Sequence, residues 1–224
     1  MHRMHVLIMH MHTHAPMTWC LEIFITMKKS SLIILFCFFT AMLATGTCLL
    51  CEHCKSASDL CSGPLQNCTG VEEDACLTLT IETRADKVRK VVTYKGCTKL
   101  SYCPPGPWTI TMDLKKRIRS NSECCCWDHC NKGGLRLPVL GKQNRLWCPR
   151  FKSSTCSIDD KLYCHGREIN CFYLAGYTES GGKNETYVRR GCGTKHTCID
   201  KPGIFGIPGL FLEKVTKTEC SKAT

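Results

Sequence analysis

Alternating apolar and polar residues mark two regions of the chain, and both predict β-structure. The first is Leu77–Thr83; a return stretch rich in β-branched residues, Val88–Tyr94, follows a turn at Arg84–Asp86. The second begins with Phe172–Leu174 and turns at the glycine-containing stretch Ser180–Asn184 before the chain returns. No stretch of the sequence combines a helical period with capping residues. The pattern therefore predicts an all-β fold.

The spacing of the cysteines repeats between the two halves of the chain. A dense set runs from Cys51 to Cys130 and a sparser set from Cys148 to Cys220. In both halves three cysteines are separated by gaps of twenty and five residues: Cys76, Cys97 and Cys103, and then Cys171, Cys192 and Cys198. Each half reaches a Glu-Cys dipeptide whose cysteine follows after a further twenty or twenty-one residues. These shared spacings indicate a duplicated module.

The beginning of the chain predicts secretion. From Met27 the sequence has a basic Lys28-Lys29, an apolar run Leu32–Leu43 and then small residues, so residues 27–48 are interpreted as a signal peptide. The apolar run is shorter than the stretch of about 20 residues that a transmembrane helix needs. A signal peptide works only at the start of a chain. Residues 1–26, which contain Met-His repeats, are therefore interpreted as a spurious upstream extension.

The secreted part is expected to form two small domains in tandem. Each half of the chain is too short to bury a sufficient core without covalent bridges, so both domains should be rich in disulfides. The expected boundaries are residues 49–131 for the first domain, 132–147 for a linker and 148–224 for the second domain.

The first half carries a specific cysteine framework. Its ten framework cysteines are separated by 2, 6, 6, 7, 20, 5, 20, 0 and 4 residues, and Asn131 follows the last of them. This spacing resembles the three-finger, snake-toxin-like domain of the lymphocyte antigen 6/urokinase receptor family. The resemblance implies three β-hairpin loops that project from a knot of five disulfides: Cys51 with Cys76, Cys54 with Cys61, Cys68 with Cys97, Cys103 with Cys124, and Cys125 with Cys130.

The second half has a reduced version of this framework. Phe151 stands where the second cysteine of the opening pair is expected, and the closing vicinal pair is missing. A complete first domain followed by a six-cysteine domain that opens with Cys148-Pro149 resembles the gamma-type phospholipase A2 inhibitors, with Thr216–Thr218 as a small insertion. The resemblance implies three further bridges: Cys148 with Cys171, Cys164 with Cys192, and Cys198 with Cys220.

Three cysteines, Cys48, Cys126 and Cys156, depart from the framework. Signal cleavage after Cys48 satisfies the small-x-small rule and would start the secreted chain at Leu49. An additional disulfide between Cys126 and Cys156 would then account for the remaining two. The alternative is a bridge between chains, which would join the protein into a homo- or hetero-oligomer.

The residues do not indicate enzymatic or metal chemistry. Cys51–Cys54 and Cys126–Cys130 contain zinc-ligand types, but such sites usually need two clusters in a reducing compartment, so we expect neither a metal nor another cofactor. No nucleophile-elbow or paired-carboxylate motif accompanies the histidines. The His-Asp pair and the glycine-rich calcium loop of phospholipases also have no counterpart in the sequence. We therefore expect no catalytic residues and no enzymatic activity.

Charge and linker composition indicate candidate surfaces for a partner. The chain has 30 Lys and Arg against 19 Asp and Glu, a formal net charge of +11. A basic run at Lys115–Arg117 either faces solvent or steers acidic partners and polyanionic glycans. The stretch Leu135–Gly141 resembles the Leu/Pro-rich connection of the gamma-type inhibitors, with one proline, and either contacts an enzyme or covers the interface between the domains. The candidate contact residues are Leu135, Leu137, Pro138, Val139, Leu140, Lys115, Lys116 and Arg117.

Two sequons predict N-glycosylation. Asn184 lies in a predicted hairpin tip and is the stronger candidate. Asn67 is weaker, because the middle residue of its sequon is Cys68, which is expected in the disulfide knot.

Two classes of function remain. The resemblance implies a secreted, non-enzymatic protein that binds and inhibits a secreted phospholipase A2, without nucleic acid and without a membrane anchor. The alternative is a secreted or cell-surface three-finger receptor or ligand-binding module without phospholipase inhibition. A cell-surface module should carry a lipid-anchor signal, whereas the apolar stretch Ile204–Leu212 is interrupted by glycine and proline.

Overall fold

β-structure dominates the part of the chain that the computed structural model describes, which is residues 49–70, 73–113, 115–150 and 160–224. The strands are β1 (Leu50–Glu52), β2 (Cys54–Ser56), β3 (Leu65–Asn67), β4 (Ala75–Ala85), β5 (Val88–Thr98), β6 (Trp108–Asp113), β7 (Lys116–Cys125), β8 (Gln143–Pro149), β9 (Lys161–His165), β10 (Asn170–Ser180), β11 (Lys183–Gly193), β12 (Gly203–Ile207) and β13 (Phe211–Lys222). Two short 3-10 helices, η2 (Leu100–Tyr102) and η3 (Lys195–Thr197), accompany them, and these described residues contain no α-helix. The predicted all-β fold is confirmed.

The two hairpins expected from the alternating pattern are the longest strand pairs of the fold. β4 pairs with β5 and β10 with β11, both antiparallel and along their full lengths. Gly181 and Gly182 both have positive φ, 59° and 74°, which permits a two-residue turn whose twist matches the flanking strands. The strands therefore continue to Ser180 and resume at Lys183, which makes this turn shorter than the predicted one at Ser180–Asn184.

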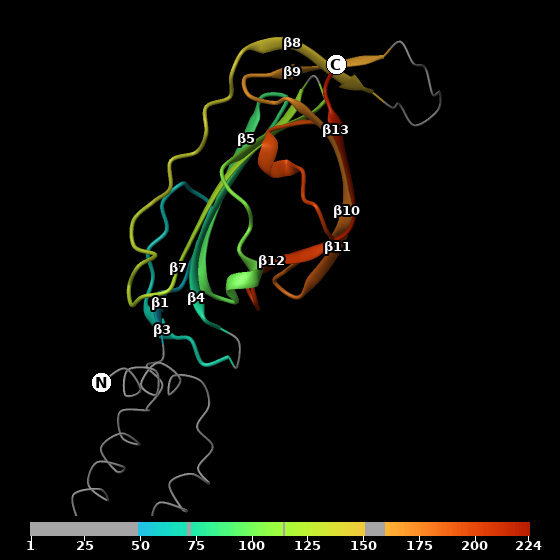
Figure 1. Ribbon diagram of the computed structural model, residues 1–224. Helices are drawn as coiled ribbons and strands as arrows, with labels where there is room; N and C mark the ends of the chain where they lie inside the picture. The colour runs from blue at the N-terminus through green and yellow to red at the C-terminus, as the bar shows by residue number, and fades with distance from the viewer. Residues whose placement is uncertain (1–48, 71–72, 114, 151–159) are drawn as a thin grey trace, which may run out of the picture. The chain divides into compact units, whose positions relative to one another are not determined.

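One nine-stranded sheet contains strands from both repeats, in the order β12-β13-β10-β11-β6-β7-β4-β5-β2 (Figure 1). The repeats meet where β6 pairs with β11, through Thr111 with Cys192 and Ile110 with Gly193. Gly191, next to this junction, has a φ of 147°, and a Cβ there would lie 2.1 Å from the carbonyl oxygen of Thr111. Only glycine allows the two backbones to approach so closely.

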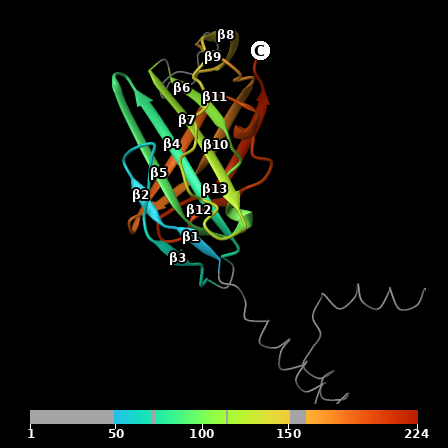
Figure 2. The same cartoon turned by 90° about the vertical axis from the view of Figure 1, so that its left-hand side faces the viewer.

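Two further two-stranded sheets, β1 with β3 and β8 with β9, form the first finger of each repeat (Figure 2). β8 begins at Gln143, so residues 143–147, expected to end the linker, belong to a strand. The linker of the structure is correspondingly shorter than the predicted 132–147.

Side chains from both repeats fill a shared core. One cluster consists of Ile110, Ile118, Phe172, Leu174 and Val215. A second cluster packs Ile207 against Leu77, Leu79 and Tyr94, and the ring of Tyr94 stacks on that of Phe211 with centroids 5.0 Å apart. By their contacts, the described residues form one compact unit. The two expected domains are thus joined by a sheet and a core as well as by the linker.

A β-bulge explains the extra residue of the second repeat. The register between β10 and β13 shifts between Ala175, opposite Lys217, and Gly176, opposite Val215, so Thr216 has no partner residue on β10. The Thr216 hydroxyl donates to the carbonyl oxygen of Ala175 at 3.1 Å. One unpaired residue is what a bulge adds to a strand. It falls within the stretch Thr216–Thr218 that the resemblance to the family marks as an insertion.

Candidate functional site

Eight disulfides fix the two repeats within the described ranges: Cys51–Cys76, Cys54–Cys61, Cys68–Cys97, Cys103–Cys124, Cys125–Cys130, Cys148–Cys171, Cys164–Cys192 and Cys198–Cys220. They are the same pairs that the family resemblance implies. In each repeat two bridges are stacked, with the sulfurs of Cys51 and Cys68 3.2 Å apart and those of Cys148 and Cys164 3.8 Å apart. The two close groups of three cysteine sulfurs lie in these stacks, so they have no thiolate to offer a metal ion.

The three cysteines outside the framework have different positions. Cys126 is exposed and bonds to no other cysteine among the described residues. Its expected partner Cys156 lies outside the described residues, as do Cys48, the signal peptide at 27–48 and the extension at 1–26. A bridge of Cys126 to Cys156, and the alternative of a bridge to a second chain, both stay predictions.

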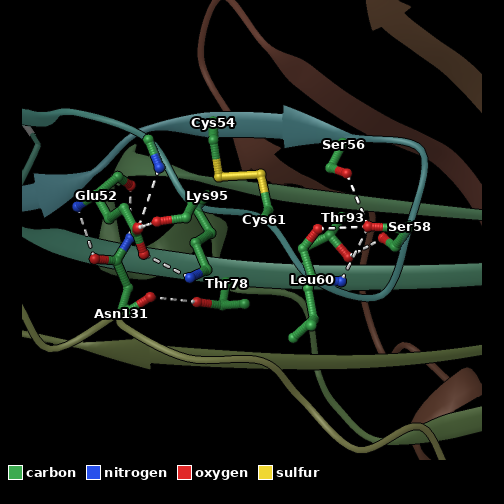
Figure 3. Close-up of a disulfide and its surroundings, with 12 residues drawn as sticks. Glu52, Cys54, Ser56, Ser58, Leu60, Cys61, Thr78, Thr93, Lys95 and Asn131 are labelled. Atoms are coloured by element: carbon green, nitrogen blue, oxygen red, sulfur yellow. Dashed lines mark hydrogen bonds and ion pairs between the residues drawn. A yellow bond between two sulfur atoms is a disulfide. The ribbon is translucent and has the colours of Figure 1, made fainter.

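Asn131 ties the end of the first repeat to its beginning, beside the Cys54–Cys61 bridge (Figure 3). Its side-chain oxygen accepts a hydrogen bond from the main-chain N–H of Glu52 at 2.8 Å, and its side-chain nitrogen donates to the Glu52 carbonyl at 2.8 Å. The Thr78 hydroxyl donates to the Asn131 carbonyl at 3.3 Å. The side chain thus takes the place of a neighbouring strand for β1, which anchors the start of the linker.

A buried ion pair lies next to Asn131 in Figure 3. The Lys95 ammonium is 2.6 Å from one carboxylate oxygen of Glu52, and its side chain is 1% exposed. The other oxygen accepts hydrogen bonds from the Ser62 hydroxyl and the Gly63 N–H. Burial alone would raise the pKa of Glu52, but the hydrogen bonds from Lys95 and Ser62 outweigh it and lower this pKa. The ion pair of Lys95 and Glu52 therefore joins β5 to β1.

The linker runs along β7, on the opposite face from the shared core. Alternate side chains of β7 point to opposite faces, and Ile118 and Ser120 are buried toward the core. The other face holds three carbonyl groups of the linker: Asn121 Nδ2 donates to Arg136 at 3.0 Å, Arg119 Nη1 to Pro138 at 3.0 Å, and Arg117 Nη2 to Gly141 at 3.3 Å. Side-chain donors on a rigid strand thus fix the path of this segment.

Gly141 closes the linker onto the second repeat. A Cβ at Gly141 would lie 2.4 Å from the Cα of Gly166, so the two backbones leave no room for a side chain. The Gly166 N–H donates to the carbonyl of Lys142 at 2.7 Å. The linker is therefore attached at both ends and along its length.

Glu82 organises the arginines beneath the linker. Its side chain is fully buried on β4, directly opposite Arg119 of β7. Arg119 donates to both carboxylate oxygens, at 3.0 and 2.8 Å, and the Nε groups of Arg84 and Arg89 donate at 2.6 and 2.7 Å. Arg119 also donates to the carbonyl of Pro138, so Glu82 fixes the linker indirectly, through Arg119.

Burial by itself would raise the pKa of Glu82. The hydrogen bonds from Arg119, Arg89 and Arg84 outweigh this effect and lower the pKa to about 2. Glu82 therefore stays ionised over the whole physiological range of pH. Reasoning from the sequence missed its role, although an acidic residue on the polar face of a strand with Arg84 two positions later is a usable signal.

The predicted basic contact run does not act as one group. Lys115 pairs with Asp86 at 3.1 Å, and both side chains are largely exposed. Lys116 is also exposed, at the start of β7. Arg117 instead donates to the carbonyl of Gly141, so it helps to hold the linker.

The apolar residues of the linker divide in a similar way. Leu135, Leu137, Pro138 and Leu140 are half-buried, whereas Val139 is 86% exposed. Trp127, which no sequence pattern marks as a contact residue, is 66% exposed. Together with Leu135 it borders a cavity of about 200 Å³ at the start of the linker. An exposed apolar side chain on a fixed backbone is suited to docking. We define the candidate contact surface as the linker residues 135–140 with Trp127.

Both sequon asparagines are accessible. Asn184 is exposed beside the turn between β10 and β11, and Asn67 is exposed at the end of β3. Glycosylation at either position stays a prediction. Within the described ranges, no helix has the length and apolar character that crossing a bilayer would demand.

Comparison with known proteins gives the chain a family and relatives. Residues 46–133 and 146–222 each match the u-PAR/Ly-6 domain. Phospholipase A2 inhibitor PIP of Malayopython reticulatus is 33% identical over 159 residues, which cover 70% of this chain and 79% of that protein. A phospholipase A2 inhibitor gamma subunit of Gloydius brevicaudus siniticus is 27% identical, covering 78% and 89%, and the phospholipase A2 inhibitor 31 kDa subunit of Naja kaouthia is 26% identical, covering 63% and 77%.

Among solved structures, mouse TEX101 matches 77% of this chain and 98% of its own, with a TM-score of 0.38 and 18% identity. That likeness is too distant to bear on function. The cysteine framework, the eight bridges and the two domain matches all point to the same family. This chain belongs to the u-PAR/Ly-6 domain family and contains two copies of the domain in tandem.

Proposed function

We propose that this protein is a secreted, non-catalytic inhibitor that binds phospholipase A2. The observation that carries the proposal is its similarity to several phospholipase A2 inhibitors over most of both proteins, up to 33% identity. Binding without catalysis also agrees with the site. Its exposed groups are apolar side chains and main-chain surface, and the charged groups beneath it, Glu82 and Arg119, are engaged with each other.

The structure supports a mode of binding in which the candidate contact surface meets the enzyme. Association costs free energy when a flexible loop must be ordered, and a preformed segment avoids much of that cost. Here three β7 side chains, Arg117, Arg119 and Asn121, already hold the backbone of the linker. Val139 and Trp127 are then displayed as apolar anchors of the kind that dominate protein interfaces.

Inhibition is tested with the oxidised, secreted protein and a panel of secreted phospholipase A2 enzymes. Complex formation is measured by surface binding, and hydrolysis of a phospholipid substrate is measured with increasing amounts of the protein. We expect at least one enzyme to form a complex and to lose activity in proportion to it. If no enzyme of the panel binds, the proposal fails and the receptor or ligand-binding module becomes the better explanation.

Replacing Val139 with serine should weaken the complex by up to about tenfold, because an apolar side chain that the enzyme covers would be lost. The measurement is the dissociation rate of the complex. Val188→Ser is the matched control, since Val188 is 63% exposed on β11, away from the linker. An equal effect of the two substitutions, or no effect of either, would place the contact elsewhere on the protein.

A further inference from the structure

Basic residues are concentrated at one fingertip of the first repeat. There the turn of the second finger, between β4 and β5, lies beside the turn of the third finger, between β6 and β7. The register places Ala85 opposite both Val88 and Lys116, and the Asp86 N–H donates to the carbonyl of Lys115 at 2.8 Å. Seven basic residues lie within this small region: Arg84, Lys87, Arg89, Lys90, Lys115, Lys116 and Arg117. Three acidic residues lie in the same region: Glu82, Asp86 and, opposite Lys116, Asp113. The fingertip is therefore strongly cationic.

Two of these arginines are held side by side. Arg84 of β4 lies directly opposite Arg89 of β5, an arrangement of like charges that is unfavourable in a sheet. Both are retained by the buried carboxylate of Glu82, and each is bound through its Nε. Their side chains remain 48% and 54% exposed. The outer edges of two neighbouring guanidinium groups are thus positioned to donate to an oxyanion.

The basic residues also surround the fingertip. Arg84, Arg89 and Arg117 are paired in one row of the sheet and so share one face. Lys90 and Lys116 are one position away from members of that row, so their side chains point to the opposite face. Lys87 and Lys115 lie in the turns between these faces. A protein surface docks on one face of a sheet, whereas a flexible linear polyanion can follow charges from one face to the other.

We propose that this fingertip, defined as residues 84–90 and 115–117, binds the sulfate groups of a sulfated glycosaminoglycan. The arginine pair contacts a sulfate through charge-assisted hydrogen bonds, and the four lysines attract the rest of the chain. This activity goes beyond the proposed phospholipase binding at linker residues 135–140, although Arg117 belongs to the fingertip and also donates to Gly141 at the end of the linker. A protein bound in this way would be concentrated at cell surfaces and matrix that carry such glycans.

The test is binding of the full secreted protein to immobilised heparin, compared with chemically desulfated heparin, at several salt concentrations. Arg84→Gln with Arg89→Gln should weaken binding about tenfold, because two charge-assisted contacts are lost. Lys87→Gln with Lys90→Gln should also weaken it, without touching the bonds to Glu82. Lys195→Gln with Lys201→Gln removes the same charge from exposed positions of the second repeat and should change affinity less than about twofold.

Three outcomes would overturn the proposal. The unaltered protein fails to bind heparin at physiological salt, or binds the desulfated form equally well. The control pair weakens binding as much as the fingertip pairs, which would indicate net charge alone. The fingertip pairs leave heparin binding unchanged but weaken a phospholipase complex, which would assign the fingertip to a protein partner. Unfolding curves of each variant verify that the fold is retained.

Discussion

Replacing Lys95 with methionine is expected to lower the free energy of unfolding by about 3–5 kcal/mol, because the change leaves a buried carboxylate without its partner charge. The side chains of Lys95 and Glu52 are both buried, that of Lys95 is the larger, and methionine roughly preserves its volume. Glu52 would keep its bonds to Ser62 and Gly63 but would lose the ammonium at 2.6 Å. The loss should extend to Asn131, which is bound to the main chain of Glu52.

Urea unfolding with the disulfides intact measures this effect. The sign of its pH dependence follows from Glu52, whose pKa is lowered in the folded state from 4.5. The stabilising contribution of Glu52 is present above pH 4.5 and is lost as the pH falls. In the variant the ammonium no longer opposes the effect of burial, so the orphaned carboxylate is neutralised at a higher pH than in the unaltered protein. The difference between the two proteins should therefore narrow in acid. Lys90→Met, on an exposed part of the same strand, is the control, and a similar loss in both variants would contradict the argument.

Replacing Glu82 with glutamine should destabilise the protein by about 3 kcal/mol at neutral pH, the free energy that corresponds to moving a pKa from 4.5 to about 2. A neutral amide cannot balance Arg84, Arg89 and Arg119, which would then repel one another. The linker should also loosen, because Arg119 loses its anchor while it still reaches Pro138. Amide hydrogen exchange in the linker should therefore become faster, in addition to the change in the unfolding curve.

The acid sensitivity of the two proteins separates this effect from a general loss of packing. The folded pKa of Glu82 is depressed, so its contribution is fully present above about pH 4.5 and is lost as the pH falls toward 2. The variant lacks this titration and should show a flatter pH dependence in that window. Glu219→Gln removes the acid of an exposed pair with Lys217 and should change little. A pH dependence unchanged by Glu82→Gln would refute the role given to this carboxylate.

The cysteine spacing and strand alternation were informative because both depend on neighbours close in sequence. A gap of twenty residues between Cys76 and Cys97 suits a hairpin with a cysteine at each end, and β4 and β5 place these two cysteines opposite each other. Each then forms a bridge to the first finger, Cys76 to Cys51 and Cys97 to Cys68. The one-residue excess before Cys220 likewise corresponds to a bulge at Thr216. In such cases the local pattern contains the information that the fold uses.

The contacts between the repeats could not be obtained in this way. The pairing of β6 with β11 joins residues that are far apart in the sequence, such as Thr111 and Cys192. The alternation of apolar and polar residues shows which face of a strand is buried, but not which strand pairs with its edge. The repeated Gly-Cys dipeptides were a partial signal, since Gly191 contacts Thr111 and Gly96 contacts Ile207 of the other repeat. The different role of Arg117 within the basic run Lys115–Arg117 could not be predicted for the same reason. Its side chain bonds to Gly141, which is distant in the sequence.

The pairing of β6 with β11 joins two different edges, the third finger of one repeat and the second finger of the other. A contact between unlike surfaces can in principle be repeated without end, and between separate molecules it builds filaments. Here the sheet curls until β12, the far edge, reaches β5 of the first repeat, where Thr98 donates to the Gly206 carbonyl and Ile207 packs on Leu77. β2 covers β5 as well. Two copies of one module thus close onto each other within a single chain, so that β5 is covered and only the short strands β12 and β2 remain at the edges of the sheet. Short edge strands offer little to a third copy or a neighbouring molecule.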